Sequence, residues 1–118
     1  MHYNFDLDLQ DGVKGETHLA TLLNHKKIEV KRDFLVSDTG NIVVEFESRE
    51  NPSGIITTEA DWWAFILDGH KFKTQQIILI KTERLRWLIE NCNFPIVQGG
   101  DNKTSKMYLI SISYLCNY

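Results

Sequence analysis

The chain has 118 residues, of which 42% are hydrophobic and 11% aromatic, so we expect one domain over residues 1–118 with its own core. Its net charge of −3 argues against a protein whose only task is sequence-independent DNA binding, because such proteins are usually basic. No apolar run approaches the length of a membrane span, and the N-terminus lacks the features of a signal peptide. Cys92 and Cys116 have no metal-ligand spacing, so we expect free thiols in a cytoplasmic protein.

The first half of the chain predicts a helix followed by two strands. Residues 12–24 carry apolar residues at helical spacing and end at an asparagine. Residues 27–35 alternate between apolar and charged side chains, as a strand does, and residues 42–48 alternate in the same way. The sequence Ser-Asp-Thr-Gly-Asn between them is typical of a tight turn and predicts a hairpin, with Gly40 in the left-handed conformation.

The second half predicts three further strands and one further helix. Residues 49–57 indicate a loop, and Trp-Trp-Ala-Phe-Ile-Leu beyond it predicts a strand preceded by a short helical turn. A buried strand over 75–81 follows, then a helix that Thr82 caps, a loop, and a last strand over 107–115. We therefore predict an α/β domain in which a mixed β-sheet with a β-hairpin core is flanked by helices.

Glu16 is unusual because it shares the apolar side of the first predicted helix. It precedes Leu19, Ala20 and Leu23 by three, four and seven residues, which places all four on one helical face. A glutamate on a core-facing stripe costs stability unless a partner compensates its charge. The alternative is that its side chain reaches solvent at the edge of the stripe.

The predicted hairpin brings further carboxylates together. With a three-residue loop, Asp33 faces Glu45 at a Cβ separation of roughly 5 Å, and Lys31 faces Glu47. Carboxylates that face each other destabilise a sheet unless a positive group lies between them. Oxygen ligands without paired Cys or His favour Mg²⁺ or Mn²⁺ over zinc. The alternative is a solvated face on which Lys31 pairs with Glu47 or Glu29, and another loop length would change the register.

These residues resemble the PD-(D/E)XK nuclease superfamily, in which a helix carrying a glutamate precedes a strand with an aspartate and a strand with Glu-x-Lys. Glu16, Asp33 and Glu45 match these positions, within residues 12 to about 81. The lysine position holds Glu47, as in some restriction endonucleases of the superfamily, and Lys31 is the alternative lysine. The scale and the order of elements are similar to those of small phage-encoded nucleases and Holliday-junction resolvases.

The resemblance implies a metal-dependent endonuclease that hydrolyses phosphodiester bonds in nucleic acid, with DNA as the expected substrate and RNA as the alternative. Asp33, Glu45 and Glu47 would hold Mg²⁺ or Mn²⁺, with Glu16 nearby, and Lys31 would stabilise the charge that develops on the phosphate. Many junction nucleases of this fold are homodimers, so a homodimer is an expectation too. A phage-encoded protein of this kind would act in the host cytoplasm.

Substrate contacts are expected from basic and hydroxyl side chains around the carboxylates. Trp62 and Trp63 could stack on an exposed base, although a tryptophan pair in an apolar run usually places at least one ring in the core. The backbone amides of Gly99 and Gly100 could bind phosphate. The candidate side chains, each of which could equally be ordinary surface, are Lys14, Arg32, Arg49, Ser53, Thr57, Thr58, Lys103 and Lys106.

Two other functions fit the same sequence. A non-catalytic nucleic-acid-binding module on the same fold is consistent with the missing motif lysine. A protein-interaction domain, such as an inhibitor of a partner protein, is consistent with the net charge of −3. Metal affinity at Asp33 and Glu45 favours the enzyme, whereas an exposed apolar patch without an acidic pocket favours the interaction domain.

Overall fold

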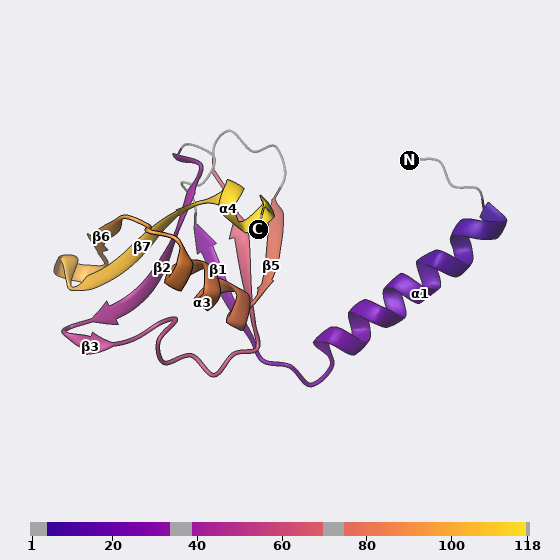
Figure 1. Cartoon of the computed structure of the whole chain (residues 1–118), viewed down its shortest axis with the longest axis horizontal. Helices are drawn as coiled ribbons and strands as arrows, with labels where there is room; N and C mark the ends of the chain where they lie inside the picture. Colours follow the sequence, from indigo (N-terminus) through magenta and orange to yellow (C-terminus); the bar gives the residue numbers. More distant parts are fainter. Residues whose placement is uncertain (1–4, 34–38, 70–74, 118) are drawn as a thin grey trace.

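The strands of this chain form two sheets that share one core, and the first helix extends away from them (Figure 1). The structure is a computed structural model that describes residues 5–33, 39–69 and 75–117. Its elements in chain order are α1 (Phe5–Leu23), β1 (Ile28–Asp33), β2 (Asn41–Ser48), β3 (Asn51–Pro52), β4 (Trp62–Leu67), β5 (Gln76–Lys81), α3 (Thr82–Asn91), β6 (Ile96–Gly99), the short 3₁₀ helix η1 (Asp101–Lys103), β7 (Ser105–Ser111) and α4 (Ile112–Asn117).

The first sheet is mixed and has the strand order β1-β4-β5. β1 runs parallel to β4, and β5 runs antiparallel to it. Trp63, Phe65 and Leu67 of β4 point to one face and are buried there, together with Ile80 of β5. The apolar run of β4 is the central strand of this sheet, with β1 and β5 at its two edges.

The second sheet is antiparallel and has the strand order β3-β2-β7-β6. Ile42 and Val44 of β2 and Ile110 of β7 are almost completely buried, so the predicted alternation is confirmed for the first four residues of β2. They contact the buried residues of the first sheet and of α3 in one cluster. This confirms the predicted α/β class with a mixed sheet and helices, although the strands divide into two sheets.

The predicted hairpin between residues 27–35 and 41–48 is wrong. β1 pairs with β4, and β2 pairs with β7 and β3. Both segments are strands and Gly40 has the predicted left-handed φ of 69°, but residues 34–38 of the expected turn lie outside the described residues. Alternation identifies a strand without identifying its partner, and the apolar β4 offers β1 more burial than the half-polar β2 does.

Several predicted boundaries also differ. α1 begins seven residues before the expected start at residue 12. Thr82 does not cap α3: Lys81 is the capping residue, and the Thr82 hydroxyl donates instead to the Ala60 carbonyl oxygen at 2.7 Å. The last strand ends at Ser111, and the chain continues as α4 rather than as strand to residue 115. Cys92 and Cys116 are free thiols, as expected.

Candidate functional site

The four carboxylates proposed as a metal site are separated by the pairing of the strands. In the first sheet Asp33 is opposite Leu67, whereas in the second sheet Glu45 is opposite Met107. Asp33 and Glu45 are therefore not cross-strand neighbours, which corrects the expectation from the hairpin. The side chain of Asp33 itself lies outside what the structure describes.

A β-bulge separates Glu45 from Glu47. Glu45 pairs with Met107 and Glu47 pairs with Lys106, so two steps along β2 correspond to one step along β7. Met107 and Lys106 are consecutive residues of β7, so they point to opposite faces of the sheet. Glu45 and Glu47, which lie opposite them on β2, therefore also point to opposite faces. The sequence predicted one shared face, and that prediction is wrong.

Each of these carboxylates has a partner of its own. The Ser53 hydroxyl lies 3.0 Å from Glu45 Oε2 and donates to it, and Lys106 Nζ lies 3.2 Å from Glu47 Oε2. Lys31 was expected beside Glu47, but it pairs with Glu29 at 3.4 Å, which was the alternative for this strand. Its ammonium group also lies 5.5 Å from the centre of the buried Trp63 ring.

Glu16 was expected on a core-facing stripe, but it is exposed on α1. α1 has no extensive contact with any other described helix or strand, so its apolar side does not face the core. Within the described residues, no group of three His, Cys, Asp or Glu side chains could hold a metal ion.

Three of the basic residues proposed as substrate contacts come together in one pocket, which we call the turn pocket. It has a volume of about 440 Å³ and lies where the β2–β3 turn meets the β6–β7 connection. The Arg49 amide donates to the Thr104 carbonyl oxygen at 3.0 Å and ties the two segments together. The pocket is lined by Glu47, Arg49, Glu50, Gln98, Lys103, Thr104 and Lys106.

The backbone around the turn pocket adopts a conformation that usually selects glycine. Arg49 and Glu50 have φ values of 50° and 67°, and Asn102 and Lys103 have φ values of 57° and 54°. A side chain in the left-handed region costs roughly 1–2 kcal/mol per residue, and a two-residue hairpin turn of this type prefers Asn-Gly. Charged residues occupy three of these four positions, Arg49, Glu50 and Lys103, although glycine would relieve the strain. Strain of this kind concentrates at functional sites.

The sequence did not identify Glu50, Gln98 and Thr104 as part of a site. The signal that could have found them is the pair of polar segments Arg-Glu-Asn and Asp-Asn-Lys, each between two strand-forming runs. Their juxtaposition depends on β2 and β6 lying on either side of β7, which is a long-range pairing.

The remaining proposed contacts lie outside the turn pocket. Arg32 donates to Asp68 Oδ2 at 2.7 Å, and this hydrogen bond, followed by that from the Gly69 amide, lowers the pKa of Asp68 below its ordinary value of 3.8. The Thr58 hydroxyl accepts from the Ala60 amide. Residues 54–57, which include Thr57, form a turn, and the exposed Lys14 lies on α1.

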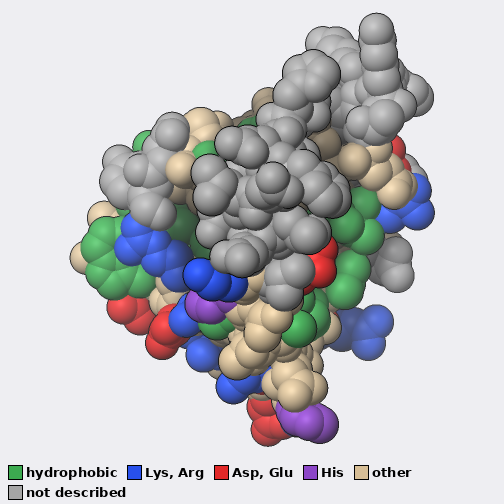
Figure 2. Space-filling view, turned by 90° about the vertical axis from the view of Figure 1, so that its right-hand side faces the viewer, with side chains coloured by type: hydrophobic (Ala, Val, Ile, Leu, Met, Phe, Trp, Pro, Cys, Tyr) green, Lys and Arg blue, Asp and Glu red, His purple; other side chains and the backbone are tan. Residues whose placement is uncertain are grey.

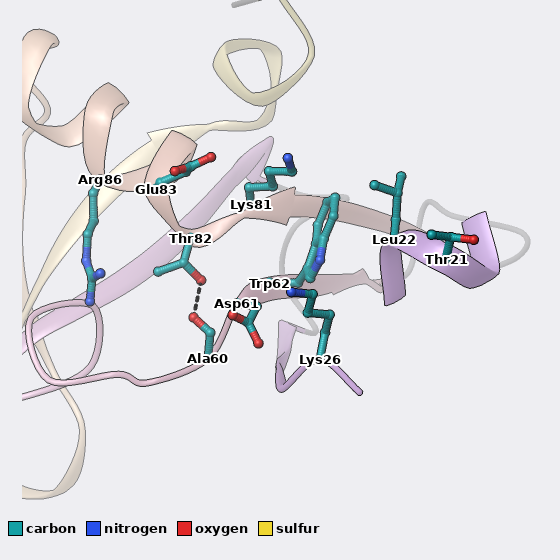
Figure 3. Close-up of a pocket in the computed structure, with 10 residues that line it drawn as sticks. All are labelled: Thr21, Leu22, Lys26, Ala60, Asp61, Trp62, Lys81, Thr82, Glu83 and Arg86. Carbon is teal, nitrogen blue, oxygen red and sulfur yellow. Dashed lines mark hydrogen bonds between the residues drawn. The ribbon is translucent and has the colours of Figure 1, made fainter. Parts of the chain in front are cut away.

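A second pocket lies where α1 joins the sheets, and we call it the joint pocket (Figure 3). It has a volume of about 450 Å³. Trp62, expected as a base-stacking ring, is half-buried here beneath Lys81, whose ammonium group lies 5.8 Å from the ring centre. Arg86 donates to the carbonyl oxygens of Ile55 and Thr58, so its charge serves the local structure.

Comparisons of the chain with family models, with curated proteins and with solved structures find no match. Among the described residues, no helix is both long and apolar enough to cross a membrane.

Proposed function

We propose that this chain binds the phosphate backbone of a nucleic acid in the turn pocket. The observation that carries the proposal is the convergence of Arg49, Lys103 and Lys106 on one pocket, two of them held in left-handed backbone. Phosphate contacts come mainly from Arg and Lys side chains, helped by polar side chains such as that of Gln98. A local basic site of this kind is compatible with a net charge of −3. Salt screens the interaction between the bound phosphates and carboxylates that lie more than about 10 Å away.

Binding is tested by fluorescence anisotropy with labelled single-stranded, double-stranded and branched DNA and with RNA, in EDTA over a salt series. Loss of one phosphate contact should reduce the slope of log K against log[salt] by about 1, so Lys103→Ala and Lys106→Ala should each weaken binding several-fold. Lys26→Ala is the matched control, because it removes one cation from the joint pocket instead. Unchanged binding in both turn-pocket variants contradicts the proposal, and a loss in Lys26→Ala alone moves the site to the joint pocket.

Metal-dependent phosphodiester hydrolysis is the second candidate. The observation that favours it is that Glu47 and Glu50 line the same pocket as the three cations. Mg²⁺ is typically held by one or two carboxylates together with substrate phosphates, so oxygen donors of this kind fit it. When bound, such a cation lowers the pKa of a water and neutralises charge on the phosphate. Lys106 would leave its ion pair with Glu47 and bind a phosphate oxygen of the substrate. Arg49 would bind a second phosphate oxygen.

The family resemblance assigns catalysis to a different set of residues. It relies on Asp33, Glu45 and Glu47, with Glu16 nearby and Lys31 stabilising charge on the phosphate. Cleavage assays with plasmid, single-stranded and branched DNA and with RNA, in Mg²⁺, Mn²⁺ or EDTA, distinguish the two sets. Glu47 belongs to both sets. Loss of cutting in Glu47→Gln but not in Glu45→Gln or Asp33→Asn supports the turn pocket, whereas loss in Glu45→Gln and Asp33→Asn supports the set from the resemblance. Wild-type protein that binds nucleic acid and cuts none is a non-catalytic binding module.

A further inference from the structure

The first sheet has a second apolar face, on the side away from the core, and its two edge strands leave apolar side chains largely exposed there. Register places alternate residues of β1, β4 and β5 on the side away from the core, and we call this side the outer face. Ile28, Val30 and Ile77 are 40%, 56% and 66% exposed on it. Its members are Ile28, Val30, Arg32, Trp62, Ala64, Ile66, Ile77, Leu79 and Lys81.

A strand face of this composition is unusual at a protein surface. In a half-exposed sheet the face in contact with water is normally polar, and large contiguous apolar patches mark contact sites. Figure 2 views the molecule from the side toward which α1 projects and shows hydrophobic side chains at the surface, with Lys and Arg side chains beside them. The outer face therefore needs a cover.

In the same chain, the apolar side of α1 is not packed against any other described helix or strand over most of its length. α1 has 19 residues and includes Gly12 and Gly15, each of which costs about 1 kcal/mol relative to alanine in a helix interior, and most helical stability in proteins comes from packing of an apolar side. Residues 14–21 are all exposed, and Leu19 is 51% exposed. The helix extends away from the sheets (Figure 1), so its own apolar side is as uncovered as the outer face.

The two surfaces are complementary in charge and in size. The sequence of α1 carries four carboxylates against one lysine, whereas the outer face carries Lys81 and Arg32, of which Arg32 already pairs with Asp68 at 2.7 Å. Strands of six residues are about 20 Å long, and a 19-residue helix is about 28 Å long. One α1 is therefore long enough to cover one outer face.

The joint between α1 and β1 keeps only the C-terminal end of α1 beside its own outer face, and the rest of the helix extends away from the sheets. The Lys27 amide donates to Asp61 Oδ2 at 2.9 Å, and the Lys27 carbonyl oxygen accepts from the Asp61 amide at 2.8 Å. Before this anchor, the Asn24 and Lys26 amides continue the hydrogen bonding of the helix end. Thr21 and Leu22 line the joint pocket, where they stand beside Trp62 (Figure 3).

We propose that the outer face is covered by α1 of a second copy of this chain, in a reciprocal exchange that forms a homodimer. Each α1 lies on the outer face of its partner, and each contact occurs twice about a two-fold axis. Exchange of an identical element between copies requires only that the element already projects from its own body, as α1 does. This inference uses no residue of the turn pocket and is independent of the nucleic-acid proposal.

The test is the mass of the full-length chain by size-exclusion chromatography with light scattering, at tens of micromolar protein. We expect about twice the chain mass of 13.7 kDa. Leu19→Lys on α1 and Ile77→Lys or Val30→Lys on the outer face should each raise the dimer dissociation constant at least tenfold and give monomers. All three positions are already exposed, so the fold should survive, and far-UV circular dichroism checks this.

The matched controls are Ile56→Lys and Ile96→Lys. These residues are 56% and 58% exposed but lie outside α1 and the first sheet, so these variants should stay dimeric. A monomeric wild type overturns the proposal, because no second copy then covers the outer face. A dimer that Ile77→Lys breaks and Leu19→Lys leaves intact also overturns it, because the sheets then meet without the helix.

Discussion

Gly54 is held between a left-handed backbone conformation and a close neighbour. Its φ is 55°, and a Cβ built on it would collide with the backbone carbonyl of Glu45. The approach is this close because the Ile55 amide donates to the same carbonyl oxygen at 2.9 Å, which holds Ile55 in the core. A side chain here would separate the loop from β2.

We expect Gly54→Ala to lower the free energy of unfolding by about 2 kcal/mol more than Gly40→Ala does. Gly40 has a similar φ of 69°, but its Cβ would meet no described atom within 4 Å. Gly40→Ala therefore measures the conformational cost alone, about 1–2 kcal/mol. Urea denaturation of both variants checks the difference. Equal losses would mean that the loop can move away from Glu45 at no cost.

At the scale of elements, the two turns of the turn pocket place charged residues in a backbone conformation that lowers stability and that glycine would adopt more easily. Arg49→Gly should leave the free energy of unfolding unchanged or raise it by up to about 1 kcal/mol, because glycine relieves the left-handed strain but loses backbone entropy. The same change should weaken nucleic-acid binding several-fold. Thermal melts and anisotropy titrations measure the two effects on one protein. A variant that is both destabilised and fully able to bind would contradict the functional reading of this strain.

At the scale of the whole molecule, the two sheets should unfold together. Their buried residues form one cluster with α3, although no hydrogen-bonded strand pair joins the sheets among the described residues. Ile110 on β7 is completely buried, so Ile110→Ala should cost about 2–5 kcal/mol. The tryptophans lie on β4 and α3, so their fluorescence reports on the other side of the core.

We therefore expect Ile110→Ala to shift the urea midpoint of tryptophan fluorescence by the same amount as that of far-UV circular dichroism. Ile96→Ala is the control, because its side chain is largely exposed and should change the free energy of unfolding by less than about 0.5 kcal/mol. Two separate transitions would show that the sheets fold as independent units.

The sequence by itself identified β1, β2, β4, β5 and β7 and the burial of many of their side chains, but not the short strands β3 and β6, which fall in segments predicted as loops. Ile42 and Val44 are buried as their alternation predicts, and Trp63 is in the core, because local periodicity reports the burial of one face directly. Gly40 has the left-handed φ that its turn sequence predicts. Arg49, Lys103 and Lys106 were proposed individually as substrate contacts from their charge and position.

Only the tertiary structure decided the partners of those strands and therefore the site. β1 joins β4 instead of β2 because pairing depends on burial against distant segments, which periodicity does not contain. The bulge in β2 reverses Glu47 relative to Glu45, and one unpaired residue is enough to do this because the side-chain period of a strand is two. The turn pocket exists because β7 brings two distant turns together, so the basic side chains meet only in the folded chain.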